Sequence, residues 1–221
     1  MNIQWIVAIP TALAIVACKP PATRGKDVQQ QDTKQQDARQ QDATQQDGAR
    51  PSTAHTVEEG QLADFLAHLP DYRHVKNLRI DDQLSCDALE QVMTLDDLEN
   101  LYILYNACDQ FPKLSSVPAR LRHLSLHLPV NTQSLPASLS ALSSLQSLDV
   151  DCPSLQSVGT AVLALPHLET LGLTQTGVAS LPDELGKLPA LKQIYIGLTE
   201  GAEELESSFE AKFPQIDVVI N

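Results

Sequence analysis

The chain has 221 residues, enough for one domain of medium size with appendages, and its formal net charge is −13. The charge is uneven: residues 19–54 carry six basic and five acidic side chains, whereas residues 55–221 carry nine basic and 23 acidic ones. A body with a net charge of −14 repels phosphate backbones, and no basic patch interrupts it. The composition therefore excludes a nucleic-acid-binding protein.

The N-terminus, residues 1–17, is apolar from Ile3 onward and carries no charged side chain. It is shorter than the roughly 20 residues that a transmembrane helix needs, and Pro10 interrupts it. Its length and its small final residues are typical of a secretory signal peptide. We therefore expect residues 1–17 to be a signal peptide.

The end of this segment, Ile15-Val16-Ala17-Cys18, resembles the lipobox of bacterial lipoproteins. The resemblance implies cleavage before Cys18 and acylation of its thiol and new amine, and Lys19 after it implies the outer membrane. Acyl chains contribute about 0.8 kcal/mol per buried methylene, which gives a firm anchor. Two departures are Ile15, where leucine is usual, and the lack of Lys or Arg before the apolar core. The alternatives are a simple secretory signal with an incidental cysteine, or an uncleaved anchor.

Residues 18–54 form a polar segment in which a five-residue unit rich in Gln and Asp repeats. After Val28 it contains no apolar side chain larger than alanine, so it cannot bury enough surface to offset the entropy of ordering. We expect a solvated tether that spans on the order of 30–35 Å, taking about 5–6 Å times the square root of its length. The predicted tether separates the membrane anchor from the folded domain.

Residues 55–74 are predicted to form an N-terminal helical cap. Thr56 and Glu59 have the spacing of a capping box, which predicts a helix over residues 57–69. Leu62, Phe65, Leu66 and Leu69 fall on one face of that helix, and Pro70 ends it. A single amphipathic helix needs an apolar surface to cover.

That surface is predicted by an internal repeat over residues 75–221. Six copies of an L-x-x-L-x-L pattern are separated by 23, 23, 24, 23 and 23 residues; they begin at Val75, Leu98, Leu121, Leu145, Leu168 and Leu191. A degenerate seventh copy, FPQIDV, begins at Phe213. The pattern resembles the leucine-rich repeat, which implies an α/β solenoid with a parallel concave sheet. Residues after Gly201 are expected to form a helix and a last strand that cap the C-terminal end.

The repeat lacks one feature of regular solenoids. The asparagine that usually follows the strand is present at Asn106, but the equivalent positions of the other copies are held by Gln83, Pro129, Pro153, Thr176 and Thr199. The hydrogen-bonded ladder of asparagines is therefore expected to be weak, and the solenoid locally flatter.

Motifs of catalysis and cofactor binding are missing from the sequence: it has no Gly-rich phosphate loop, no G-x-S-x-G and no H-E-x-x-H. His123 and His127 share a predicted strand but lie about 13 Å apart at about 3.3 Å per residue, too far for one ion. His127 is placed to meet Asp151, and also Asp149, on the next strand. This arrangement fits a polar binding surface better than a metal site. We expect no enzyme activity, no cofactor and no metal.

Two cysteines, Cys86 and Cys108, occupy nearly equivalent positions in adjacent repeats. Neighbouring strands are about 4.8 Å apart, within the roughly 4.4–6.8 Å between α-carbons that a disulfide requires. A secreted chain permits oxidation, so a disulfide is predicted here. The alternative is a pair of buried thiols that fill repeat positions.

The partner-binding surface is predicted from the alternation of side chains along the strands. The positions expected on the concave face and assigned to binding are Arg79, Tyr102, Leu104, Tyr105, His123, His127, Leu128, Asp149, Asp151 and Tyr195. Tyrosines and flanking apolar residues often carry interface energy, so Tyr102 and Tyr105 are the expected centre. The alternative is that both tyrosines pack against the irregular segment after Asn106.

Together these features predict a monomeric leucine-rich repeat domain that a lipid holds at the bacterial cell envelope and that binds a protein partner through its concave face. The alternative function is structural: an envelope lipoprotein that organises a complex through its convex side or its tether.

Overall fold

A computed structural model describes residues 52–106, 112–197, 199 and 201–220 of the chain, and all of them fall in one compact unit that begins at Arg50. The predicted signal peptide, Cys18 and the predicted tether lie outside the described residues, except for the last three residues of the tether. Cys108 also lies outside them, so the predicted disulfide with Cys86 stays a prediction.

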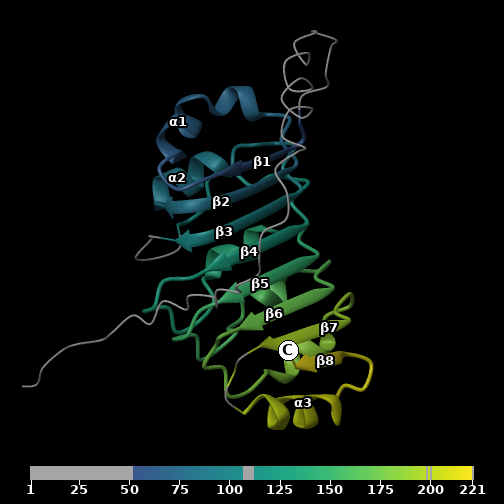
Figure 1. Cartoon of the computed structure of the whole chain (residues 1–221). Coiled ribbons are helices and arrows are strands. Elements are labelled where there is room, and N and C mark those ends of the chain that lie inside the picture. Colours follow the sequence, from purple (N-terminus) through teal and green to yellow (C-terminus); the bar gives the residue numbers. More distant parts are fainter. Residues whose placement is uncertain (1–51, 107–111, 198, 200, 221) are drawn as a thin grey trace, which may run out of the picture. The chain divides into compact units, whose positions relative to one another are not determined.

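The described residues form one sheet of eight parallel strands whose spatial order follows the chain (Figure 1). The strands are β1 (Ala54–Val57), β2 (Asn77–Leu84), β3 (Asn100–Asn106), β4 (His123–His127), β5 (Ser147–Asp151), β6 (Thr170–Thr174), β7 (Gln193–Gly197) and β8 (Asp217–Ile220). Each strand pairs with the next at a spacing of one repeat, as Leu78 with Leu101 and Leu101 with Leu124. Two parallel strands need a connection that brings the chain back to the side where the first strand began, and each repeat supplies one.

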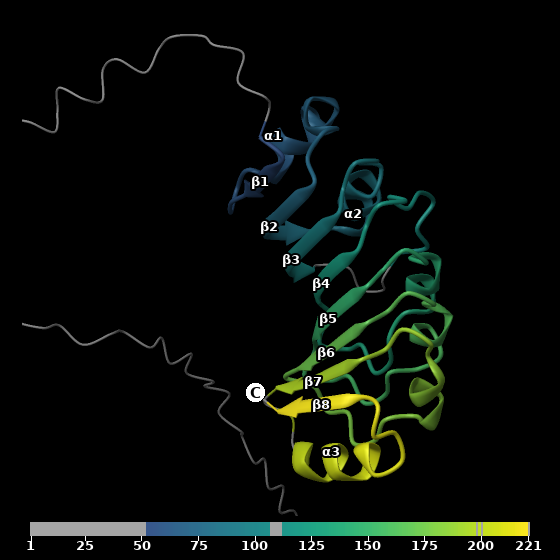
Figure 2. The same cartoon turned by 90° about the vertical axis from the view of Figure 1, so that its right-hand side faces the viewer.

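The connections lie on the opposite side of the molecule from the strands (Figure 2). They contain α1 (Leu62–Ala67), the 3₁₀ turn η1 (Leu69–Tyr72), α2 (Cys86–Val92), η2 (Ala137–Ala141), η3 (Val162–Ala164), η4 (Asp183–Lys187) and α3 (Ala202–Glu210). Helical segments outside a parallel sheet, one strand per repeat of 23 or 24 residues, define an α/β solenoid of the leucine-rich repeat type. The predicted fold class is confirmed.

The sheet contributes two rows of aliphatic side chains to the core, and side chains of the connections pack against them. One row is Leu78, Leu101, Leu124, Leu148, Leu171, Ile194 and Val218; the other is Ile80, Ile103, Leu126, Val150, Leu173 and Ile196. Each of these side chains is at most 2% exposed. Since one repeat has no opposite layer of its own, this burial depends on the neighbouring repeats.

The N-terminal end differs from the prediction, because strand β1 replaces the first turn of the expected helix. Residues 52–57 stand one repeat before Val75, and Val57 pairs with Ile80 and is fully buried. The helix α1 starts only at Leu62, after Gly60 at φ +83°. Asp82 on β2 accepts hydrogen bonds from the N–H groups of Gly60 (2.9 Å) and Leu62 (3.2 Å). The predicted capping box is therefore wrong: Thr56 belongs to a strand, and Asp82 holds the start of the helix.

The C-terminal end contains the predicted helix and last strand, α3 and β8. The register of the seventh copy is wrong by two residues, because Val218 and not Ile216 lies opposite Ile194. Phe213 lies outside the strand, packs its ring against Phe209 at 4.9 Å and covers Gly186, where a side chain would collide with that ring. Ile216 is buried just before the strand. Phe213 and Ile216 therefore both pack before the strand, which begins at Asp217.

Other side chains replace the asparagine ladder in the later repeats. The thiol of Cys152 lies 3.5 Å from the carbonyl oxygens of Pro129 and Thr132, one repeat earlier. Thr176 and Thr199 place their hydroxyl oxygens 3.3 Å apart in a buried position. Burial raises the pKa of the Cys152 thiol, so it stays protonated and acts as a donor. Proline or threonine stands at the asparagine position of these repeats. The contacts of Cys152, Thr176 and Thr199 therefore satisfy carbonyl and hydroxyl groups that have no asparagine as a partner.

Candidate functional site

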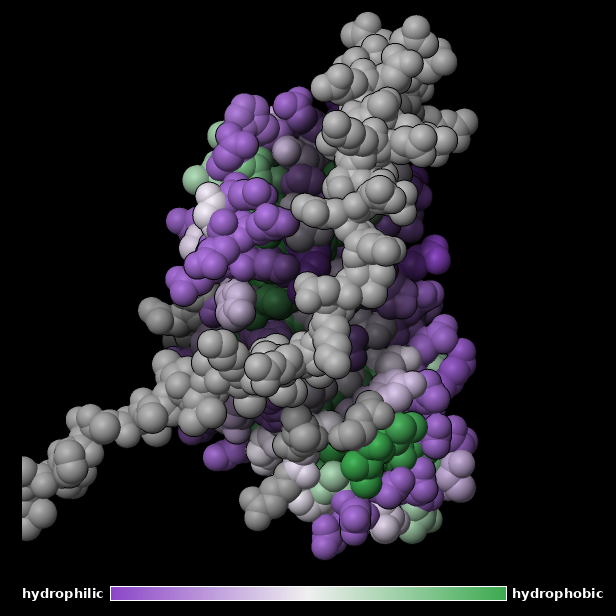
Figure 3. Space-filling view, in the orientation of Figure 1, coloured by the Kyte–Doolittle hydropathy of each residue, from purple (hydrophilic) through white to green (hydrophobic). Residues whose placement is uncertain are grey.

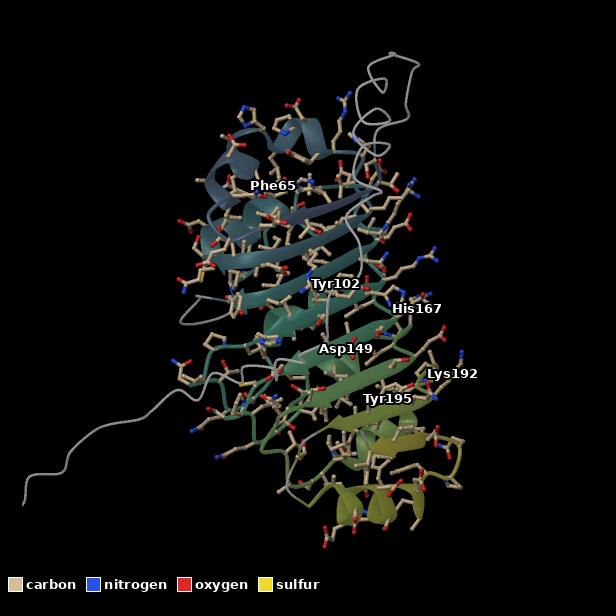
Figure 4. The ribbon with its side chains drawn as sticks, in the orientation of Figure 1. Phe65, Tyr102, Asp149, His167, Lys192 and Tyr195 are labelled. Carbon is tan, nitrogen blue, oxygen red and sulfur yellow. The ribbon has the colours of Figure 1, made fainter. Side chains whose placement is uncertain are left out.

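The concave face of the sheet presents a central row of side chains that are neighbours in register. This row is Thr56, Arg79, Tyr102, Ser125, Asp149, Gly172, Tyr195 and Val219. Tyr102, Asp149 and Tyr195 lie along one line across the strands in Figure 4. Four predicted site residues, Arg79 among them, therefore share one surface as expected from strand alternation.

Two tyrosines on β3 are the most prominent side chains of this face. Tyr102 is 41% exposed and Tyr105 is 55% exposed, whereas Leu104 between them is half-buried. A register shift between Ile80 and Gln83 places Gln83 opposite Tyr105. The extra residue of this bulge lies on β2, and Tyr105 stands next to the last residue of β3, where it is more exposed than Leu104.

A groove of about 310 Å³ lies beside Tyr102 at the N-terminal end of the sheet. Its lining, here called the β1–β3 groove, consists of Ala54, His55, Thr56, Asn77, Leu78, Arg79 and Tyr102. His55 is held by rings behind it, with Phe65 at 5.5 Å and Tyr72 at 4.5 Å. These ring contacts hold β1 from behind, while Tyr102 and Ala54 form the apolar part of the groove and Arg79 and Asn77 its polar wall.

Arg79 forms the cationic part of that wall. Its Nε lies 2.8 Å from Oδ1 of Asp81, two residues along the same strand, and its side chain remains 50% exposed. A guanidinium carries five N–H donors, of which this contact uses one. The ion pair orients the group and leaves its Nη donors for a ligand.

A cluster of histidines and aspartates follows on β4 and β5. Nε2 of His127 lies 3.6 Å from Oδ2 of Asp151. Burial raises the pKa of Asp149, although Ser147, whose hydroxyl lies 3.5 Å away, and the nearby His123 oppose that shift. The Asp149 carboxylate lies over Gly172, where any side chain would collide with it. Within the described residues no group of three or more His, Cys, Asp or Glu is arranged to hold a metal ion.

Two predicted site residues, Leu128 and Tyr195, are less exposed than the alternation of side chains along the strands predicts. Leu128 is 5% exposed and lies in the core, and its N–H donates to the carbonyl oxygen of Asp151. It follows the end of β4, where the alternation no longer applies, so its assignment to the surface was wrong. Tyr195 is half-buried, and its hydroxyl donates to Oε1 of Gln193 at 3.0 Å. The cysteine Cys86 begins α2, away from the concave strands.

Two residues of the groove were not predicted from the sequence. Ala54 and Thr56 come from β1, which was predicted as tether and helix. The signal that identifies them is the repeat length itself, since counting back 23 residues from Val75 reaches Ser52.

Comparisons with known proteins give distant likenesses. No protein-family model matches the chain. A protein of Arabidopsis thaliana described as a disease resistance protein is 28% identical over 137 residues, which are 59% of this chain and 11% of that protein. A leucine-rich repeat protein of Leptospira interrogans aligns over 68% of this chain and 44% of its own, with 20% identity and a TM-score of 0.48. An internalin of Listeria monocytogenes aligns over 69% of this chain and 56% of its own, with 16% identity and a TM-score of 0.40.

None of the helices in the described part of the chain has the length and apolar character that crossing a membrane requires.

Proposed function

We propose that the domain binds a protein partner through the N-terminal half of its concave face, with Tyr102 and Tyr105 at the centre of contact. The observation that carries the proposal is the exposure of these two tyrosines, 41% and 55%, on a strand of a rigid sheet. Large exposed aromatic side chains on a fixed backbone lose little conformational entropy when they are buried by a partner.

The surroundings of the tyrosines support this assignment. Arg79 is the register neighbour of Tyr102 on one side and Ser125 on the other, and His123 and His127 are exposed on the next strand. Asp149 and Asp151 lie one strand further and would form a polar rim. An aromatic centre with a polar rim is the usual anatomy of a protein interface.

The test is capture of envelope proteins from the producing bacterium by the purified full chain and its variants. Tyr102→Ala and Tyr105→Ala should each weaken binding of the captured partner by about 1–3 kcal/mol, with a thermal midpoint close to that of the wild type. Thr174→Ala, an exposed residue of β6 on the same face, is the control and should bind normally. If the tyrosine variants retain full binding, or lose binding and folding together, the proposal is wrong.

We also propose that the domain is monomeric and is held at the bacterial outer membrane by lipid on Cys18. The support is the lipobox-like sequence at residues 15–18 and the Gln- and Asp-rich segment that follows it. Cys18→Ser should give an uncleaved or soluble form that no longer partitions into detergent. Unchanged membrane retention of that variant would contradict the lipid anchor.

A further inference from the structure

We propose that the β1–β3 groove is a subsite for a carboxylate that lies next to an apolar side chain on a peptide segment of the partner. This inference rests on the proposed function and specifies which chemical group the concave face recognises. The groove combines the apolar surface of Tyr102 and Ala54 with one oriented guanidinium, and these two features select such a group.

The shape of the groove follows from small side chains beside large ones. Ala54 and Thr56 stand on β1, at the end of the sheet, whereas Arg79 and Tyr102 stand in the same row on β2 and β3. The resulting space of about 310 Å³ is at the lower end of the roughly 300–1,000 Å³ of ligand pockets. It therefore suits one or two side chains of a peptide better than a whole cofactor.

The apolar part of the groove lies on a rigid backbone. Tyr102, which is 41% exposed, and Ala54 offer its apolar surface, whereas Leu78 is fully buried in the core and His55 stacks on Phe65 behind the strand at 5.5 Å with an interplanar angle of 18°. Burial lowers the pKa of His55, so its ring is neutral at pH 7 and adds no positive charge to the groove. An apolar side chain that enters the groove meets surfaces that do not need to rearrange.

The charge that a ligand meets there comes from Arg79. Asp81 contacts its Nε, so the paired Nη donors remain for a second carboxylate, the planar group that a guanidinium binds in bidentate fashion. Asn77 stands at the same wall, where its Oδ1 accepts a hydrogen bond from Nδ2 of Asn100 and its own Nδ2 remains as a donor. The groove thus offers several donors to a carboxylate.

Asp81 offsets part of the positive charge of Arg79, so the free Nη donors of Arg79 carry the recognition of a second carboxylate. The other acidic residues of the concave face lie further away or are engaged elsewhere. Asp149 lies in the same row as Arg79 but three strands away, about 14 Å at about 4.8 Å per strand. That separation exceeds the Debye length of about 8 Å at physiological salt. Asp82, which is closer in sequence, accepts the N–H groups of Gly60 and Leu62.

The experiment uses the full chain in detergent and three fluorescein-labelled peptides. The first ends in Gly-Ser-Phe with a free carboxylate, the second has the same sequence with a C-terminal amide, and the third contains an internal Phe-Glu with an amide end. Fluorescence polarisation should give a dissociation constant of about 0.1–1 mM for a carboxylate peptide. The amide peptide should bind about tenfold or more weakly. Preference for the first or the third peptide identifies a chain terminus or an acidic side chain as the source.

The matched variants are Arg79→Gln and Lys192→Gln. Arg79→Gln should remove the preference for the carboxylate, whereas Lys192→Gln should not, because Lys192 pairs with Glu169 at 2.6 Å just before β7, away from Tyr102 (Figure 4). Equal binding of acid and amide peptides, an unchanged preference in Arg79→Gln, or no binding at millimolar concentration would overturn the inference.

Failure of this inference is distinguishable from failure of the proposed function. If the peptides fail but Tyr102→Ala and Tyr105→Ala still lose the captured partner, only the carboxylate subsite is wrong. If the peptides bind through Arg79 while both tyrosine variants keep the partner, the subsite stands and the tyrosine surface is wrong.

Discussion

Both ends of the sheet need a cover for the apolar core of the terminal repeat. Each uses a strand and a helix, but the two elements follow one another in opposite order along the chain. At the N-terminal end strand β1 comes first and α1 follows, with Phe65, Tyr72 and His55 clustered behind the strand. At the C-terminal end α3 comes first and β8 follows, with Phe209 and Phe213 in contact at 4.9 Å. Each end of the described sheet covers the open core of its terminal repeat with a helix and aromatic rings, in the place that a neighbouring repeat takes elsewhere in the sheet.

The two ends of the sheet differ in the backbone groups that a carboxylate binds there. At the N-terminal end Asp82 of β2 reaches outward to the N–H groups of Gly60 and Leu62 and so holds the start of a helix. At the C-terminal end Glu210 of α3 reaches inward and accepts the N–H of Val218 at 3.0 Å. The N–H of Asp217 donates to the carbonyl oxygen of Lys192, just before β7, so the next N–H, that of Val218, points to the open side of β8. One carboxylate satisfies a helix terminus, and the other satisfies a sheet edge.

The largest expected effect comes from removing the aromatic side chain at either end. Phe65 and Phe209 are 2% and 3% exposed, and truncation of a buried phenylalanine costs about 3–5 kcal/mol. We expect Phe65→Ala and Phe209→Ala each to lower the free energy of unfolding by that amount, as measured by urea denaturation. Val130→Ala is the control, because Val130 is 77% exposed and should change the free energy by less than about 0.5 kcal/mol.

These two variants also test whether the ends are equivalent. A repeat array transmits stability only between neighbours, so a weakened end is expected to unfold before the rest. If Phe65→Ala costs several kcal/mol and Phe209→Ala nearly nothing, the C-terminal helix does not act as a cap.

The regular repeats were predictable from sequence, because each apolar position of the pattern has one environment. The copies that begin at Leu98, Leu121, Leu145, Leu168 and Leu191 all produced strands where the pattern placed them. The ends were less predictable because their environment differs. In β1, His55 stands at the position that Leu78 holds in β2. In the last copy, Phe213 fits the apolar pattern although it lies before β8, so the pattern predicts the wrong register.

The candidate site was predictable where strands alternate and not where they bend or end. Arg79, Tyr102 and Asp149 lie on the concave face because they sit inside regular pairing. Leu128 is buried because it follows the last residue of β4. The groove needed β1, whose residues carry no leucine, so no search for the leucine pattern would find it.

A smaller effect is expected from the carboxylate at the N-terminal end. Hydrogen bonds from Gln83, Leu62 and Gly60 hold the pKa of Asp82 below its ordinary value of 3.8. A lowered folded-state pKa means that Asp82 stabilises the fold above about pH 4, and that this stabilisation is lost as the pH falls through the folded-state pKa. Asp82→Ala should therefore cost about 1–2 kcal/mol at pH 7, the usual range for loss of a helix N-cap, and less at acid pH.

The measurement is urea denaturation of the wild type and Asp82→Ala between about pH 3 and 7. Asp96→Ala serves as the control, since Asp96 is an exposed aspartate. A difference between wild type and Asp82→Ala that stays constant over this range would show that the ionised carboxylate does not hold the helix.

The substitution Glu210→Ala is expected to have the smallest effect on stability, but unlike the others it should cause the chain to self-associate. Its loss leaves the N–H of Val218 without this acceptor at the open edge of β8, at a cost of about 1 kcal/mol. The same edge carries Ile220, which is 39% exposed, and Figure 3 shows a hydrophobic patch over β8. An unprotected apolar edge strand is a template for pairing with another chain. We therefore expect Glu210→Ala to self-associate in a concentration-dependent way, measured by sedimentation velocity, whereas the wild type should not.

Two further variants separate edge protection from a general loss of stability. Glu203→Ala removes an exposed carboxylate from the first turn of the same helix and should remain monomeric. Ile220→Lys, added to Glu210→Ala, should restore the monomer, because a charged side chain opposes pairing at a sheet edge. Asp82→Ala should have a comparable or lower stability than Glu210→Ala and still sediment as a monomer, since it weakens the other end. If Asp82→Ala associates as strongly as Glu210→Ala, association follows instability in general, and Glu210 has no specific role at the edge of β8.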